Sequence, residues 1–418
     1  MKFEYEQDFE KQGAIIKVLG IGGAGGNAIN RMIEANMKGV EFIAINTDAQ
    51  DLADSRADTK LQIGQKETKG LGTGAKTEIA KRAVKENVER IEENIRDADM
   101  VFITAGMGGG TGTGASPTVA RLAQNFDCLT VAIVTIPFDF EGPNRAEQAH
   151  KGVEELRENV DTLIVIPNQQ LIKIADSQTS LRESLRMADN ILHQATKGIS
   201  DLINNHGVIN LDFADVKTVM ENKGDAIMGT GIASGEARAS LAAQQAISSP
   251  LLNNMSIKGA SGLLINIAGG SNLTLYEVDE ACAIINEEAG EEADIIVGNI
   301  EDDSLGDKIV ITVIATGIKG ASYDEQLSTI GDNSYEAEEV EEQSTAAEPE
   351  VIKAEENEGQ EEKQTETTPT FNMGFSSTEE EMSQKQQKED EKEVPSYIRK
   401  NKKEKDKNKL PNIIQKNM

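Results

Sequence analysis

Two glycine-rich segments contain the residues whose types and spacing could do chemistry. Residues 20–27 read Gly-Ile-Gly-Gly-Ala-Gly-Gly-Asn, and residues 106–114 read Gly-Met-Gly-Gly-Gly-Thr-Gly-Thr-Gly. Each segment joins an apolar run to a helical pattern. Glycine lets the backbone approach a phosphate closely, and the start of a helix presents free N–H groups to an anion. Both segments are therefore candidates for phosphate binding.

The first segment, taken alone, leaves two interpretations open. It holds the spacing Gly20-x-Gly22-x-x-Gly25, which is typical of dinucleotide-binding turns, and Asp48 follows at a distance suited to binding a ribose. A tight strand-to-helix turn without any ligand would use similar residues.

The second segment favours a different ligand, because a glycine tract this dense costs stability unless its backbone contacts something. Consecutive N–H groups at a helix start form an anion-binding nest, and we expect Thr111 and Thr113 to add hydroxyl donors. The segment lacks the Gly-Lys-Ser/Thr of a Walker P-loop. Two phosphate loops at the ends of two parallel strands favour a mononucleotide that carries several phosphates.

The elements that must position these loops follow from the apolar pattern. Continuous apolar runs that alternate with helical patterns predict a parallel sheet covered on both faces. A long amphipathic helix over 181–204 precedes a second unit of strands and helices. The predicted strands are 15–19, 41–46, 100–105, 129–136, 163–167, 226–233, 262–268, 294–298 and 309–316, and the other predicted helices are 28–35, 77–94, 115–123, 236–247 and 275–289.

Composition excludes several classes of protein. The chain has 418 residues with a net charge of −30, which argues against a nucleic-acid binder because such proteins need cationic surface. No apolar run is long enough to span a bilayer, and the acidic start 1–6 is not a signal peptide, so we expect a cytoplasmic protein. Two cysteines, Cys128 and Cys282, provide no disulfide framework.

Residues 106–114 resemble the tubulin signature, and residues 13–320 as a whole are similar to the tubulin/FtsZ family, in particular its bacterial cell-division GTPases. The resemblance implies an α/β fold: a Rossmann-like parallel-sheet GTPase domain joined by a long core helix to a smaller α+β domain. We therefore expect a disordered N-terminal segment at 1–12, a GTP-binding domain including the core helix at 13–206, and a C-terminal α+β domain with a catalytic loop at 207–320.

The resemblance also implies which residues contact GTP or GDP. Segment 70–75 would lie near the γ-phosphate. Glu141 would accept from the ribose hydroxyls and Arg145 would reach the sugar and phosphates, although the pair alone is typical of a surface ion pair. Asn168 and Asp189 would contact guanine, since a carboxylate accepts from N1–H and the exocyclic amine, donors that adenine lacks. The phosphates would be contacted by Gly23, Ala24, Gly25, Gly26, Asn27, Gly110, Thr111 and Gly112.

The sequence departs from the family pattern at two places. Leu185 stands where many relatives have an aromatic residue that stacks on the base, which predicts weaker base affinity. Lys76-Thr77 stands where many relatives have Asn-Pro, directly after segment 70–75, and this change is expected to alter how that segment moves.

The segment 210–217 supports two interpretations. Asp212 with Asp215 three residues later fits an N-terminal helix cap. The resemblance implies instead that Asp212 and Asp215, with Asn210 nearby, enter the nucleotide site of the next subunit and polarise the attacking water. Mg²⁺ would accompany the nucleotide, and a need for K⁺ stays open. No protein metal site is expected, because the three histidines show no ligand spacing.

The last hundred residues are expected to form a tail. Residues 321–392 are rich in Glu, Gln, Ser and Thr and predict a disordered acidic linker. Within 393–418, the segment Val394–Arg399 resembles the family's partner-binding peptide, which docks on proteins such as the actin-like membrane tether, and a basic stretch, 400–409, follows.

Three functions compete at this point. The first is a GTPase that assembles head-to-tail into a homopolymer and forms the cytokinetic ring at midcell. The second is an NAD-dependent oxidoreductase built on residues 20–25, which leaves 106–114 without a role. The third is a structural filament protein that binds nucleotide without turnover, and Asp212 and Asp215 argue against it.

Overall fold

A computed structural model gives the structure of the chain and describes residues 13–318 except 177, 205–210, 253–254 and 291–292. The chain divides into two compact units after Ala337, and the second unit, 338–418, lies wholly outside the described residues. The predicted segments 1–12, 321–392 and 393–418 also lie outside them, as does the predicted domain boundary at 206/207.

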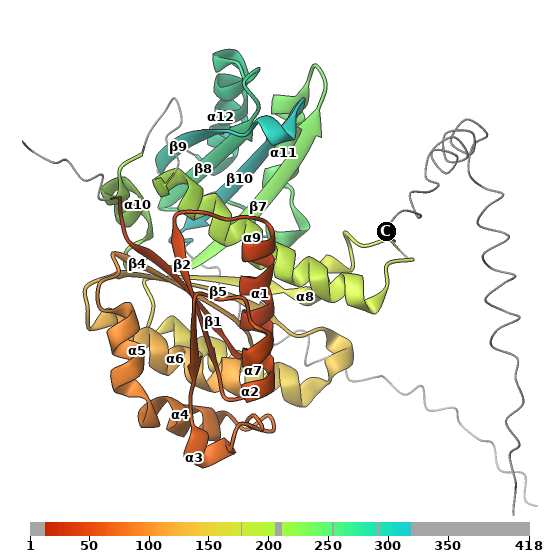
Figure 1. Cartoon of the computed structure of the whole chain (residues 1–418). Coiled ribbons are helices and arrows are strands. Elements are labelled where there is room, and N and C mark those ends of the chain that lie inside the picture. The colour runs from red at the N-terminus through yellow and green to blue at the C-terminus, as the bar shows by residue number, and fades with distance from the viewer. Residues whose placement is uncertain (1–12, 177, 205–210, 253–254, 291–292, 319–418) are drawn as a thin grey trace, which may run out of the picture. The chain divides into compact units, whose positions relative to one another are not determined.

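One ten-stranded sheet forms the centre of the described residues, with the strand order β3-β2-β1-β4-β5-β6-β7-β10-β8-β9 (Figure 1). Strands β1 to β6 are parallel, as the continuous apolar runs predicted. All six residues of β1 are buried, because helices cover both of its faces. The six strands are β1 (Ile16–Ile21), β2 (Val40–Asn46), β3 (Thr59–Gln62), β4 (Met100–Gly106), β5 (Leu129–Ile136) and β6 (Thr162–Pro167).

Two hydrophobic cores lie on opposite faces of this parallel part. Helices α1 and α9 contribute to one core, and α4, α5, α6 and α7 contribute to the other. The helices of this half are α1 (Gly22–Glu34), α2 (Ala49–Asp54), α3 (Gln65–Thr68), α4 (Thr77–Glu86), α5 (Val88–Ile95), α6 (Thr111–Gln124), α7 (Pro143–Arg157), α8 (Asn168–Leu171) and α9 (Leu181–Asn204), with a 3-10 turn at Asp139–Glu141.

The second half adds an α+β layer that continues the same sheet. Strand β7 pairs in parallel with β6 over three residue pairs, while β10 pairs antiparallel with both β7 and β8. Helices α11 and α12 pack on a third core. The elements are α10 (Phe213–Met220), β7 (Gly224–Ser234), α11 (Arg238–Ile247), β8 (Gly262–Gly269), α12 (Leu275–Ala289), β9 (Asp294–Glu301) and β10 (Lys308–Thr316), with 3-10 turns at Pro250–Leu252 and Asp303–Leu305.

Side-chain caps explain where several helices begin. Ahead of α9, Ser180 Oγ accepts from Glu183 N at 3.3 Å, and the Glu183 carboxylate accepts from Ser180 N at 2.8 Å. Thr274 and Glu277 form the same reciprocal box ahead of α12. Each box satisfies N–H groups that a helix start leaves unpaired.

The structure differs from the sequence prediction at three helices. Helices α1 and α6 begin at Gly22 and Thr111, inside the glycine-rich segments rather than after them. The single helix predicted over 77–94 is two helices, α4 and α5, which meet at Asn87. Asn87 Oδ1 accepts from Gly64 N at 2.9 Å, so this residue serves a loop contact in place of a continuous helix.

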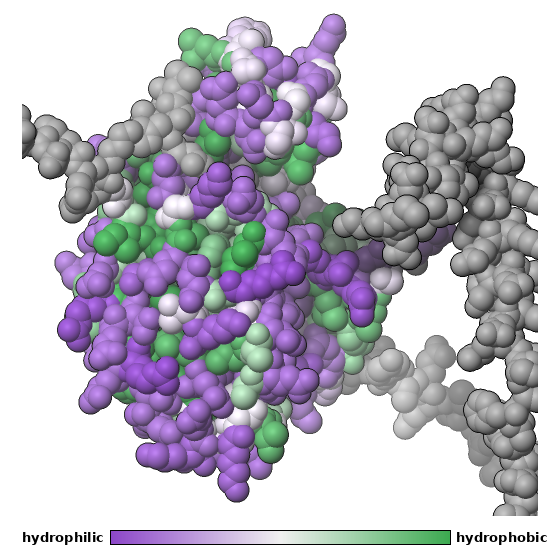
Figure 2. Space-filling model, viewed as in Figure 1, coloured by the Kyte–Doolittle hydropathy of each residue, from purple (hydrophilic) through white to green (hydrophobic). Residues whose placement is uncertain are grey.

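Hydrophilic residues predominate on the face of the molecule shown in Figure 2, and apolar residues form small clusters between them. No helix in the described part of the chain is long and apolar enough to cross a membrane.

Candidate functional site

A cavity of about 340 Å³ lies at the carboxyl edge of the parallel strands. Ligands of open α/β sheets bind at this edge, where the loops after successive strands converge. Loops that follow β1, β2, β4, β5 and β6 all line the cavity, as does the start of α9. The lining includes most of the residues predicted to bind nucleotide: Gly23, Ala24, Gly110, Thr111, Gly112, Glu141, Arg145 and Asn168.

The first wall of the cavity is the N-terminus of α1. This helix begins directly after β1 with no side-chain cap and no acidic residue in its first turn, so its first N–H groups stay available to an anion. Gly22 has φ +75°, and a Cβ there would lie 2.9 Å from Gly112 N. Gly25 is buried against β4, where a Cβ would meet Thr104 O at 2.4 Å. The structure therefore assigns Gly25 a packing role and places it behind the cavity wall.

The second wall is the N-terminus of α6. It also lacks a side-chain cap and an acidic first turn. Thr111 Oγ1 lies 2.7 Å from Thr47 Oγ1, so the two hydroxyls are hydrogen-bonded beside the cavity. The prediction for Thr113 is wrong: its side chain is buried, and its Oγ1 accepts from Gly108 N at 2.9 Å. Thr113 shapes the loop and offers no hydroxyl to a phosphate.

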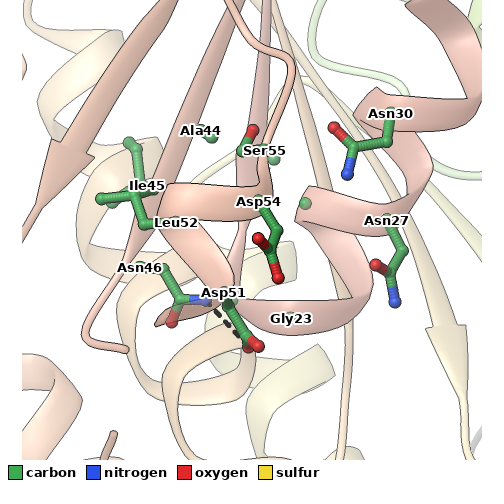
Figure 3. Close-up of a pocket in the computed structure, with 13 residues that line it drawn as sticks. Gly23, Asn27, Asn30, Ala44, Ile45, Asn46, Asp51, Leu52, Asp54 and Ser55 are labelled. Atoms are coloured by element: carbon green, nitrogen blue, oxygen red, sulfur yellow. Dashed lines mark hydrogen bonds between the residues drawn. The ribbon is translucent and has the colours of Figure 1, made fainter. Parts of the chain in front are cut away.

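A smaller recess of about 130 Å³ lies between α1 and α2, next to the wall that the start of α1 forms (Figure 3). Asn27 and Asn30 line it from α1, and Asp51 and Asp54 line it from α2. Gly26 also lines this recess rather than the main cavity.

Asp48, which the dinucleotide interpretation assigned to a ribose, caps α2 instead. Its side chain accepts from Gln50 N and Asp51 N. Asp51 lines both the recess and the main cavity, and the sequence reasoning missed it. The signal that could have found it is the polar stretch Asn46-Thr47-Asp48 at the carboxyl end of β2, a position where ligands bind.

The predicted sugar-binding pair lies after β5. Glu141 Oε1 accepts from Phe138 N at 2.9 Å, which fixes the carboxylate at the cavity. Arg145 donates to the other oxygen, Glu141 Oε2, across one turn of α7. The ion pair expected from the residues alone is thus present, and both side chains line the cavity.

The predicted base contacts lie at the end of the cavity that β6 and α9 form. Asn168 is 7% exposed, and its buried Oδ1 has no hydrogen-bond partner among the described residues. Leu185 is 46% exposed and lines both the cavity and an adjoining groove of about 810 Å³. Asp189 and Asn27 line that groove. Because Leu185 lines both, the groove continues the cavity beyond the starts of α1 and α6.

Electrostatics distinguish Asp189 from ordinary helical carboxylates. Burial raises its pKa from 3.8 to about 6, and the nearby charges of Arg31 and Arg186 only partly oppose the shift. The carboxylate accepts no hydrogen bond within the described part of the chain. An unpaired acceptor that is partly withdrawn from water is costly, and a ligand with two adjacent N–H donors would satisfy this half-buried carboxylate.

Asp212 and Asp215 lie at the opposite edge of the sheet. They begin α10, whose last residue Met220 accepts a hydrogen bond through its carbonyl from Thr162, the first residue of β6. Strand β6 then runs about 20 Å to Asn168 at the cavity. Figure 1 shows α10 far from α2 and α3, which mark the cavity end.

The capping interpretation of these two carboxylates is confirmed for one of them. Asp215 Oδ2 accepts from Asp212 N at 3.2 Å, and both side chains are exposed. Because both side chains are exposed, their oxygens are accessible to solvent or to another molecule. Asn210 lies outside the described residues.

Comparison with known proteins gives two family matches. The GTPase domain of the Tubulin/FtsZ family matches residues 15–176, and the C-terminal domain of the FtsZ family matches residues 224–319. An empty FtsZ dimer from M. jannaschii is similar at 44% identity and a TM-score of 0.72, covering 74% of this chain and 90% of that one. A GDP-bound monomer of CetZ1 from Haloferax volcanii shares the fold at 20% identity and a TM-score of 0.66, covering 76% and 98%.

Proposed function

This chain belongs to the tubulin/FtsZ family of GTP-binding, polymerising cytoskeletal GTPases, and from that premise we propose that it hydrolyses GTP at the interface between subunits of a head-to-tail filament. The observation that carries the proposal is the separation of two half-sites. The nucleotide cavity lies at the carboxyl edge of the sheet, and Asp212 and Asp215 lie at the amino edge of the same sheet.

The cavity suits a guanine nucleotide. Two uncapped helix starts, those of α1 and α6, provide N–H groups for phosphates without any competing carboxylate in their first turns. Asn168 supplies an unpaired buried acceptor, and Asp189 can accept from both N1–H and the amine of guanine. Adenine has no such pair of donors. We therefore propose GTP over ATP, with Glu141 and Arg145 at the ribose.

Hydrolysis needs an acceptor for the protons of the attacking water. The carboxylates that line the cavity of one chain are already engaged: Asp48 caps α2, Asp51 accepts from Asn46 and Glu141 pairs with Arg145. Asp212 and Asp215 have exposed oxygens suited to that role once a neighbouring subunit brings them to the terminal phosphate. Mg²⁺ bound with the nucleotide would neutralise charge on the phosphates. The similar M. jannaschii FtsZ is a dimer, which supports contact between copies.

The test is the GTPase rate as a function of protein concentration. If the site is complete only between subunits, specific activity falls steeply on dilution, while GTP binding stays constant. A rate per subunit that remains unchanged down to nanomolar protein would refute shared catalysis. Asp212→Ala should keep GTP affinity and lose most turnover, and Asp279→Ala, which removes an exposed carboxylate on α12, serves as its control.

We also propose a cellular role from the family: a cytoplasmic filament in the cytokinetic ring at midcell. Val394–Arg399 would bind partners such as an actin-like membrane tether through Pro395, Tyr397 and Ile398. A chain ending at Lys392 should still assemble with GTP but lose partner binding in a pull-down. If the truncated chain still binds its partners, Val394–Arg399 is not the partner-binding segment.

A further inference from the structure

Gln148 of α7 hydrogen-bonds two phosphate loops at once. Its Nε2 donates to Ala75 O at 3.1 Å and to Gly109 O at 2.8 Å. Ala75 ends segment 70–75, and Gly109 lies in the loop between β4 and α6. A primary amide has two N–H donors, so this one side chain satisfies both carbonyls. Gln148 does not line the nucleotide cavity itself.

Segment 70–75 needs such support because its backbone is unusual. Gly70, Gly72 and Gly74 all have positive φ, and Ala75 adopts φ +62°, a conformation that is costly for a residue with a Cβ. The beginning of the segment is held by a hydrogen bond from Ala49 N to Gly70 O at 3.0 Å. At its other end, the carbonyl of Ala75 is held by Gln148.

The two loops that Gln148 joins are in direct contact. A Cβ on Gly110 would lie 1.9 Å from Thr73 Oγ1 and 3.0 Å from Ala75 Cα. Both Gly110 and Thr73 line the cavity. A shift of segment 70–75 relative to the second glycine loop would therefore change the cavity wall directly.

The order of strands places this contact at the phosphate end of the cavity. Of the proposed base contacts, Asn168 follows β6 at the start of α8 and Asp189 lies in α9. The uncapped starts of α1 and α6 follow the central strands β1 and β4. Segment 70–75 follows β3, at the far edge of the same half. If the nucleotide lies across the carboxyl ends of these strands with its base at Asn168 and Asp189, its terminal phosphate points toward segment 70–75. This orientation rests on the proposed function.

We propose that Gln148 is a positioning residue that holds segment 70–75 against the loop around Gly109, so that the two loops together distinguish GTP from GDP. It acts through two backbone carbonyls and does not touch the nucleotide. A diphosphate occupies only the sites at the helix starts, so its affinity does not depend on the two hydrogen bonds of Gln148. A triphosphate also contacts segment 70–75, so its affinity requires both loops in place.

The test uses Gln148→Met, which keeps the length of the side chain and removes both donors, and Gln148→Lys, which restores donors. The control is Lys151→Met on the same helix, whose ammonium contacts only the exposed Glu147 among the described residues. Three quantities are measured on the full chain: the midpoint of thermal unfolding, hydrogen exchange of residues 73–76 without nucleotide, and the affinities for GTP and GDP.

Gln148→Met should fold, exchange the amides of residues 73–76 several-fold faster, and bind GDP within about twofold of the unchanged protein. Its preference for GTP over GDP should fall about tenfold, because two hydrogen bonds to the loops are lost. Gln148→Lys should recover most of both effects, and Lys151→Met should show neither.

Equal weakening of GTP and GDP, or faster exchange with an unchanged preference for GTP, would overturn the inference, since either result leaves Gln148 a purely structural role. Failure of the proposed function looks different. In that case the unchanged protein binds no GTP, while Gln148→Met still accelerates exchange in residues 73–76.

Discussion

Asp189 should make GTP affinity depend on pH near neutrality. The carboxyl is half-buried beside Leu185 and accepts no hydrogen bond within the described residues. Burial raises its pKa to about 6, so a substantial fraction is protonated in mildly acidic solution. Guanine presents two adjacent N–H donors, and only the ionised carboxylate can accept from both through its two oxygens. GTP binding must therefore expel the proton wherever the free protein holds one.

The magnitude follows from the population of the ionised form. With a pKa of about 6, half of the free protein is competent at pH 6 and roughly one eleventh at pH 5, so GTP affinity should fall about twofold and about tenfold respectively. Above pH 7 the carboxyl is ionised and the effect ends. The sign for folding is opposite: because the pKa of Asp189 is raised above 3.8, its contribution to stability declines as pH rises from about 4 to 6.

The assay is GTP binding by calorimetry at pH 5, 6, 7 and 7.5, with Asp189→Asn measured in parallel. The phosphates of GTP also titrate in this range, but they do so equally with both proteins, so the difference between the two profiles isolates the carboxyl. Asp189→Asn should bind at least about tenfold more weakly at pH 7.5, because its amide opposes the guanine donors. Identical pH profiles for the two proteins would refute the reasoning.

Two further predictions concern backbone contact and the second half of the sheet. Gly22→Ala should weaken GTP binding at least about tenfold, because the new methyl meets Gly112 N at 2.9 Å from a left-handed backbone; equilibrium binding checks this, and unchanged affinity would contradict it. Arg238→Met should lower the free energy of unfolding by about 3 kcal/mol in urea, because Arg238 is 5% exposed and binds both carboxylate oxygens of Glu277. The hydrogen bond from Arg238 lowers the pKa of Glu277 to about 2, so stability lost between about pH 4.5 and 2 should shrink in the variant.

The hydrophobic pattern predicted the strands and long helices well, because the spacing of apolar residues reports directly which side chains are buried. Strand β5 and helices α9 and α12 begin and end at the predicted residues, since each is a continuous apolar run or a 3.6-residue stripe. The prediction begins helices α1 and α6 too late, because glycine has low helix propensity and the sequence pattern therefore places the glycine-rich segments outside the helices. Tertiary packing overrides that propensity, as the contact of Gly25 with Thr104 O illustrates.

Side-chain orientation at the site was less accessible from sequence. Thr113 and Thr111 are two residues apart, yet one turns into the loop and the other toward Thr47. Gln148 contacts Ala75 and Gly109 across 73 and 39 residues of chain, and no local pattern marks it. Roles that follow from residue type could be predicted from the sequence. Roles that follow from hydrogen bonds between residues far apart in the chain could be seen only in the fold.

If the two proposed half-sites meet between subunits, their placement at opposite edges of the sheet constrains the assembly. An interface that joins a carboxyl-edge cavity to an amino-edge carboxylate uses different surfaces on its two subunits, so it is heterologous and can propagate into an open filament. One end of every filament then has a cavity without carboxylates, and the other has carboxylates without a cavity. Such a filament should allow two inactive variants to complement each other.

Asp212→Ala keeps the cavity, and Gly22→Ala keeps the carboxylates. In an equal mixture, a complete site forms wherever the intact cavity of the first meets the intact edge of the second, which occurs at about a quarter of randomly formed interfaces. At a GTP concentration that saturates the intact cavity but scarcely occupies that of Gly22→Ala, GTPase activity should rise from near zero for each variant alone to as much as about a quarter of the unchanged protein. A mixture no more active than its components would show that the acids act within their own chain or not at all.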